Sequence, residues 1–201
     1  MCFQYTGNLT VPMRLFTAID IPDQFKDTLH SFIRRLKPFA KLSWSPVENL
    51  HITTKFIGEW PEARLPEMQR VLASVCEPSA AEPIPITIRG IGWFPDTRRP
   101  RVFWAGIEAG APLGALAQRT EQAVAALGVP AETRAFAPHL TLARIRTAVS
   151  LQPLRDALQA LPSGCGFDFG SFEAADFFLY LSAGGKYTKL SAYRFAAPPV
   201  S

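Results

Sequence analysis

The sequence is poor in cysteine, and its cysteines lack the spacings that cysteine-based sites require. Cys2, Cys76 and Cys165 are an odd number spread along the chain, and no two of them form a CxxC pair. This pattern is atypical of a disulfide framework or a zinc site, and it favours a reducing compartment. We therefore expect a cytoplasmic protein that holds neither a metal ion nor another cofactor.

Long apolar runs and the common catalytic glycine motifs are also missing. No run approaches the roughly 18 apolar residues that span a bilayer, so we expect no membrane association. The chain lacks a Walker or dinucleotide-type glycine pattern and a Gly-x-Ser-x-Gly motif, so nothing indicates a P-loop or serine-nucleophile enzyme. Residues 1–12 lack the features of a signal peptide, and we predict a flexible extension there.

The remaining composition is that of a chain able to bury a sizeable core. Hydrophobic residues make up 48% of the sequence and charged residues only 19%, which argues against long disordered tracts. The formal net charge of +4 is compatible with an anionic or nucleic-acid substrate, although many ordinary proteins are equally basic. Because no Gly/Ser linker interrupts the chain, we predict a single bilobal domain over residues 13–198.

Helical and strand-like patterns are mixed along the chain. Apolar residues at helical spacing predict helices over 23–37, 65–75, 112–127 and 151–161. Runs of β-prone residues predict strands over 14–21, 42–45, 50–58, 84–94, 101–108, 139–145, 166–169, 172–181 and 187–195. This mixture predicts an α+β fold with two largely antiparallel sheets flanked by helices, arranged as two lobes around a central cleft.

Two stretches 88 residues apart carry the same motif, a histidine followed two residues later by a threonine. They are His51-Ile52-Thr53-Thr54 and His139-Leu140-Thr141-Leu142. In a strand, residues i and i+2 point to the same face, so each motif places an imidazole beside a hydroxyl. The same alternation predicts that Ile52, Phe56, Leu140 and Leu142 face the opposite way.

Two histidines with two hydroxyls suit chemistry at a phosphate. Histidine both accepts and donates a proton near neutrality. A pair that flanks one reacting centre divides this work, because one ring takes a proton from water while the other delivers a proton to the leaving oxygen. Threonine hydroxyls donate hydrogen bonds to phosphate oxygens. The residues alone do not say which histidine is the acid. The third histidine, His30, lies in a predicted helix and is expected to face solvent.

The sequence resembles the two-histidine (2H) phosphoesterase superfamily, and within it the bacterial RNA 2′,3′-cyclic phosphodiesterases, also called 2′-5′ RNA ligases. The matching stretches are MRLFTAIDIP (13–22), NLHITTKFIGE (49–59), FP…RRPRVFWAGI (94–107), RAFAPHLTLARIR (134–146) and, more loosely, LYLSAGGKYTKLSAYRF (179–195). The resemblance implies a bilobal α+β fold, no metal ion, and hydrolysis of a terminal 2′,3′-cyclic phosphate to a 2′-phosphomonoester.

The resemblance also implies roles for the motif residues. His51 corresponds to the general acid and His139 to the general base. Thr53 and Thr141 correspond to the hydroxyls that hold the phosphate. These assignments rest on the resemblance and not on the strand pattern.

Further side chains are candidates for substrate contacts. Arg134 precedes the second motif and is a candidate for neutralising a phosphate. The candidate base-stacking platforms are Phe136, Tyr187 and Trp44. Strand alternation places Arg144 opposite to His139, which favours a structural or rim role for that arginine. The turn arginines Arg98, Arg99 and Arg101 either contact an RNA backbone or form a solvated hairpin tip.

Two alternative functions stay open. Ligation of a 2′,3′-cyclic end to a 5′-hydroxyl is the reverse reaction and would use the same histidines, so the sequence does not separate it from hydrolysis. A catalytically silent RNA- or nucleotide-binding module would be expected to have lost a motif residue, whereas all four are present. In each case the partner is an RNA or nucleotide with a 2′,3′-cyclic phosphate end, and we expect a monomer.

Overall fold

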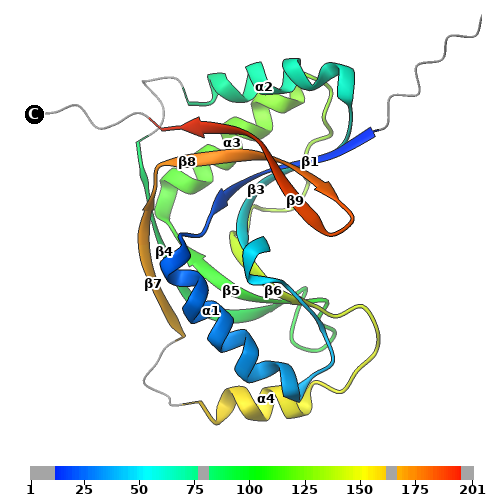
Figure 1. The fold of residues 1–201 in the computed structure, drawn as a ribbon, viewed down its shortest axis with the longest axis vertical. Helices are drawn as coiled ribbons and strands as arrows, with labels where there is room; N and C mark the ends of the chain where they lie inside the picture. The colour runs from blue at the N-terminus through cyan, green and yellow to red at the C-terminus, as the bar shows by residue number, and fades with distance from the viewer. Residues whose placement is uncertain (1–11, 77–81, 162–166, 196–201) are drawn as a thin grey trace, which may run out of the picture.

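One long, strongly curved antiparallel sheet forms the frame of the molecule (Figure 1). The computed structural model describes residues 12–76, 82–161 and 167–195. Its nine strands are β1 (Pro12–Asp20), β2 (Ser43–Trp44), β3 (His51–Pro61), β4 (Ile84–Phe94), β5 (Val102–Glu108), β6 (His139–Arg144), β7 (Asp168–Ala174), β8 (Asp176–Ala183) and β9 (Lys186–Arg194). Its four α-helices are α1 (Asp23–Leu36), α2 (Leu65–Ser74), α3 (Gly110–Ala125) and α4 (Gln152–Gln159).

The strand order divides the sheet into two lobes. Along the sheet the strands run β7-β4-β5-β6-β3-β1-β8-β9, and the short strand β2 pairs with β6. The two halves are joined where β3 meets β6, through the single residue pair Ile52 and Leu140. The predicted α+β fold with two antiparallel lobes is therefore confirmed, although the two predicted sheets are continuous. The pairing of β3 with β6 joins them, and because these strands pair through one residue only, each then follows its own lobe.

The helices cover the lobes crosswise. Helix α1 follows β1 but packs on the other lobe, where the ring centroids of Phe25 and Phe172 of β7 are 5.6 Å apart. Helix α3 follows β5 and packs on β3 of the first lobe. Figure 1 shows α2 and α3 toward one end of the molecule and α1 and α4 toward the other. Among the described helices, none has the length and apolar character needed to cross a membrane.

The boundary between the last strands differs from the prediction. The sequence predicts one strand that ends at residue 169 and another that begins at 172, on either side of Gly170. In the structure β7 continues through Gly170 to Ala174, and the chain then crosses to the other lobe as β8. A register shift against β4 next to Gly170 absorbs the irregularity. The glycine is needed for space, because a Cβ there would lie 2.4 Å from the Phe25 ring.

The first strand begins slightly earlier than predicted. Pro12 already pairs with Pro61 at the start of β1, so the predicted extension does not include it. Residues 1–11 lie outside the described residues, and their predicted flexibility stays a prediction. Residue 166, the first residue of a predicted strand, also lies outside the described residues, so its assignment to a strand stays a prediction.

Candidate active site

The two motifs begin the strands β3 and β6 at the junction of the two lobes. Ile52 and Leu140 are paired there and completely buried. The antiparallel register of this pair sets His51 opposite Thr141 and Thr53 opposite His139. These four side chains are partly exposed on the face away from the core. The structure thus brings together the histidines and hydroxyls that the sequence predicts to share one cleft.

Both imidazole rings are held by the same local contact. His51 Nδ1 lies 2.7 Å from the carbonyl oxygen of Asn49, and His139 Nδ1 lies 2.8 Å from that of Ala137. Because a carbonyl oxygen only accepts a hydrogen bond, each Nδ1 carries a proton and donates it. Each ring therefore uses Nε2 for its remaining chemistry, as an acceptor when neutral and as a donor when protonated.

His51 is enclosed by aromatic rings of its own lobe. Its ring centroid lies 4.8 Å from that of Phe16 and 5.2 Å from that of Tyr187, which meets it edge-on. This burial lowers the pKa of His51 below its usual value. The hydrogen bond to Asn49 and the nearby Asp20 carboxylate oppose the shift, because both favour the protonated ring.

His139 has a comparable environment on the other lobe. The Phe94 ring meets it edge-on at a centroid distance of 4.9 Å. Burial lowers the pKa of His139, and the Arg144 charge lowers it further, while the hydrogen bond to Ala137 opposes both effects. Two imidazoles with lowered pKa values on one face can take up and deliver a proton at a single reacting centre.

His51 lines a polar pocket of about 300 Å³. This volume is close to the lower limit for sites that bind small ligands. Asp20, the register partner of His51 on β1, lies in this pocket together with Tyr180 and Lys189. The Tyr180 hydroxyl donates to the Asp20 carboxylate, and Lys189 forms an ion pair with that carboxylate. Tyr187 lines the same pocket.

Sequence reasoning missed most of this pocket. Asp20, Tyr180 and Lys189 come from β1, β8 and β9, which are distant in the sequence and adjacent only in the folded sheet. The one local signal is that Asp20 is a charged residue at the end of an otherwise apolar strand. Of the residues that line this pocket, only His51 itself and Tyr187 belong to the predicted site.

A β-bulge corrects the prediction for Phe56. Ala18 pairs with Thr53 and Thr17 with Lys55, so Thr54 is an extra residue in β3. The bulge reverses the alternation that follows, and Phe56 lies on the His51 face instead of the core face. Its side chain is 55% exposed. Thr54 instead turns to the interior, where its hydroxyl lies 2.7 Å from that of Thr17.

A second bulge corrects the prediction for Arg144. Trp104 pairs with Thr141 and Phe103 with Ala143, so Leu142 is the extra residue in β6. The alternation is again reversed, and the exposed Arg144 lies on the His139 face. Its charge lowers the pKa of both histidines, which agrees with this placement.

The structure does not bring Trp44 to the histidines. Trp44 pairs with the fully buried Ala143, so it lies on the core face of β6. Its indole nitrogen donates to the Ala40 carbonyl at 3.2 Å, and its ring packs edge-on against Phe103. The predicted role of Trp44 as a base-stacking platform is therefore wrong, because local alternation did not reveal which face the short strand β2 would share.

Arg134 and Phe136 lie in the exposed loop before β6. The Arg134 guanidinium donates two hydrogen bonds to the Glu132 carboxylate, at 3.0 and 2.8 Å. These bonds lower the pKa of Glu132 to about 2. Phe136 has an exposed ring. The predicted substrate contacts of both residues stay predictions.

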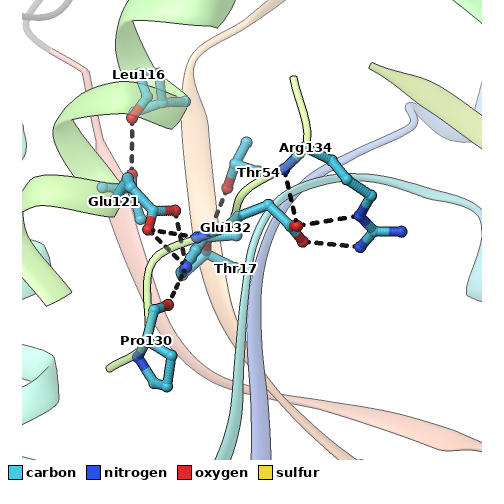
Figure 2. Close-up of polar contacts among 9 residues, drawn as sticks. Thr17, Thr54, Leu116, Glu121, Pro130, Glu132 and Arg134 are labelled. Carbon is cyan, nitrogen blue, oxygen red and sulfur yellow. Dashed lines mark hydrogen bonds and ion pairs between the residues drawn. The ribbon is translucent and has the colours of Figure 1, made fainter. Parts of the chain in front are cut away.

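A buried ion pair anchors that loop to the first motif strand, as Figure 2 shows around Glu121. The ammonium group of Lys55 lies 2.7 Å from the Glu121 carboxylate and 3.0 Å from the Pro130 carbonyl oxygen. Glu121 also accepts a hydrogen bond from the Glu132 amide at 3.1 Å. Lys55 on β3 and Glu121 on α3 thereby hold the segment that leads to the second motif.

The described residues offer no candidate metal centre. Within residues 12–76, 82–161 and 167–195, no three His, Cys, Asp or Glu side chains are grouped closely enough to hold an ion.

Comparison with known proteins places the chain in one family. The family model described as LigT like Phosphoesterase matches residues 19–104 and 107–173. A Methanocaldococcus jannaschii protein named RNA 2′,3′-cyclic phosphodiesterase is 34% identical over 170 residues, which cover 85% of this chain and 91% of the relative. A Methanothermobacter thermautotrophicus protein of the same name is 29% identical over 187 residues, covering 90% of this chain and 98% of the relative.

Solved structures agree with this placement. A Thermus thermophilus protein superposes with a TM-score of 0.73 at 28% identity, covering 92% of this chain and 99% of the other. E. coli LigT, in complex with 3′-AMP, superposes with a TM-score of 0.71 at 24% identity, covering 92% and 98%. The resemblance seen in the two motifs is confirmed, and the chain belongs to the LigT-like family of 2H phosphoesterases.

Proposed function

We propose that this protein hydrolyses the terminal 2′,3′-cyclic phosphate of RNA to a 2′-phosphomonoester. The observation that carries the proposal is the placement of His51 and His139 across the lobe junction, each with Nδ1 bonded to a carbonyl and Nε2 left for catalysis. The names of the relatives from M. jannaschii and M. thermautotrophicus support the same reaction.

The proposed reaction is an in-line displacement at phosphorus. His139 takes a proton from water as the water oxygen attacks the phosphorus. The bond from phosphorus to the ribose 3′ oxygen breaks, and His51 gives its proton to that oxygen, so no net proton is consumed by the pair. Thr53 and Thr141 donate hydrogen bonds to the non-bridging oxygens, and Arg144 balances their charge.

The charges around the two rings support giving the acid role to His51. The Asp20 carboxylate raises the pKa of His51 against the effect of burial, which favours a ring that carries a proton. The Arg144 charge lowers the pKa of both histidines, but within the described residues no carboxylate opposes it at His139, which favours a neutral His139 ring able to accept a proton. This asymmetry agrees with the roles that the family resemblance implies.

The direct test is product analysis with an oligonucleotide that ends in a 2′,3′-cyclic phosphate. Incubation with the protein in EDTA is expected to yield a 2′-phosphate end, identified by comigration with a synthetic 2′-phosphate standard that separates from its 3′-phosphate isomer. A 3′-phosphate product would contradict the proposed leaving group. An unchanged cyclic end would contradict the proposed activity. An added 5′-hydroxyl RNA shows in the same assay whether ligation competes.

The pH dependence of kcat/KM is expected to follow the lowered pKa values of both histidines. Catalysis requires one proton on the pair, and kcat/KM reports the ionisation of the free enzyme. Burial lowers both pKa values below 6.5, so the singly protonated pair is most abundant on the acid side of that value. We expect kcat/KM to peak below pH 6.5 and to fall as the pH rises through neutrality. A rate that keeps rising on the alkaline side would contradict this assignment.

A further inference from the structure

Two segments of the chain together carry a charge equal to its whole net charge. Residues 94–101 and 144–156 contain six arginines and two aspartates, which leaves four positive charges. The rest of the chain has 15 basic and 15 acidic residues and is therefore neutral in sum. The chain is therefore only mildly basic as a whole, while residues 94–101 and 144–156 are strongly basic.

These two segments are neighbours in the fold. The Ile145 amide donates to the Arg101 carbonyl at 2.9 Å, and Arg144 pairs with Val102. The guanidinium of Arg155 on α4 donates to the Thr97 carbonyl. Together the two segments carry what we call the arginine surface, which spans the connection from β4 to β5, the end of β6 and the chain that leads into α4. It consists of Arg98, Arg99, Arg101, Arg144, Arg146 and Arg155.

Five arginines of this surface are exposed and Arg155 is half-buried, and the surface is only weakly neutralised. Within the described residues, its one ion pair joins Arg98 to Asp96 at 3.8 Å, and the Arg98 side chain remains 89% exposed. Asp96 mainly bonds the backbone, since its carboxylate accepts the amides of Arg98 and Arg99 at 2.7 and 3.0 Å. The aspartate therefore shapes the hairpin tip and leaves the guanidinium groups facing solvent. Arg89, in contrast, contacts two acidic residues.

The arginine surface is continuous with the candidate active site. Arg144 stands on the histidine face of β6, and Val102 and Arg101 lead from it to the tip of the hairpin. A strand of phosphates that leaves the cleft along this path meets one guanidinium after another. Guanidinium groups suit this role because they bind phosphate oxygens through two hydrogen bonds and are only weakly hydrated.

We infer that the arginine surface binds the RNA chain that precedes the cyclic phosphate, so that the preferred substrate is an RNA of several nucleotides and not a mononucleotide. This inference rests on the proposed function, since it names the substrate class of the same site. Of the two predictions for Arg98, Arg99 and Arg101, the inference favours contact with an RNA backbone.

The test compares two substrates that share one reacting group. Uridine 2′,3′-cyclic phosphate ends at the cleft, whereas a twelve-nucleotide RNA with the same terminus also reaches the arginine surface. The double variant Arg98→Ala/Arg99→Ala is expected to lower kcat/KM for the RNA by about tenfold at low salt and to leave the mononucleotide rate nearly unchanged. The salt dependence of the RNA reaction should weaken in parallel, because fewer counterions are released.

A matched control removes two exposed arginines elsewhere. Arg14→Ala/Arg70→Ala changes the net charge equally, but on β1 and α2 in the other lobe. We expect it to lower the RNA rate by less than twofold. An equal loss in both double variants would overturn the inference, because it would indicate a general charge effect. An unaffected RNA rate in Arg98→Ala/Arg99→Ala would overturn it as well.

Direct binding separates this inference from the proposed activity. If the wild type hydrolyses neither substrate, the proposed function has failed, and fluorescence anisotropy with a labelled 3′-phosphorylated RNA still tests the surface. Weaker binding in Arg98→Ala/Arg99→Ala alone would support the inference. If polyglutamate binds the arginine surface as tightly as RNA does, a nucleic-acid role is wrong and an acidic protein partner is favoured.

Discussion

Replacing His139 with alanine is expected to lower kcat on a 2′,3′-cyclic phosphate RNA by about 10³-fold, and His51→Ala should cost a similar factor. Each variant removes one of the two proton transfers, while the fold is retained because both rings are partly exposed at the cleft. The measurement is single-turnover hydrolysis with each variant saturated by substrate. His30→Ala is the control, since His30 lies exposed on α1 as predicted and should leave the rate unchanged.

The two variants should differ on a substrate whose leaving group needs no proton. With a nucleoside p-nitrophenyl phosphodiester, loss of the general acid costs little, whereas loss of the general base still prevents the activation of water. We therefore expect His51→Ala to retain most of the wild-type activity on this ester and His139→Ala to retain little. The reverse result would exchange the two roles. Full activity of either variant on the RNA would contradict catalysis by a pair of histidines.

Replacing Glu121 with leucine is expected to lower the free energy of unfolding by about 3 kcal/mol. The Lys55 side chain is only 4% exposed, so without Glu121 its ammonium group keeps a charge in the interior with the Pro130 carbonyl as its remaining partner. The Glu121 side chain is 28% exposed, which places the loss at the lower end of the range for buried pairs. Urea unfolding measures it, provided that the slope with urea stays unchanged.

The matched control removes the whole ion pair. In Lys55→Met/Glu121→Leu no charge is left buried, so most of the lost stability should return. If the double variant is instead less stable than both the wild type and Glu121→Leu, the contact is stabilised by side-chain packing and not by charge. A loss below about 1 kcal/mol in Glu121→Leu would show that solvent screens the pair as it screens surface pairs.

Local sequence patterns predicted most of the secondary structure and the positions of the two motifs within it. The helix α1 begins at Asp23 after a proline, as predicted, and its apolar residues Phe25, Leu29, Ile33 and Leu36 are buried at helical spacing. The two motif histidines stand at the first position of their strands. These features depend on neighbours a few residues apart, which is the range over which a sequence pattern carries information.

Predictions failed where a strand departed from strict alternation. Phe56 and Arg144 were each assigned to the wrong face, because one extra residue in β3 and one in β6 reverse the alternation beyond the motif. Whether a strand accommodates an extra residue depends on the strand that pairs with it. The Thr54 bulge, for example, is visible only in the register against β1.

By itself, the sequence determined which groups are the candidates for the chemistry: two His-x-Thr motifs in strand context, a third histidine outside them, and no cysteine cluster. Only the tertiary structure decided that these motifs meet at the Ile52–Leu140 pair, that Asp20 stands beside His51, and that two arginine-rich segments are neighbours. The physical reason is that side-chain direction follows from local backbone geometry, whereas proximity across a sheet depends on the pairing of strands that are distant in the chain.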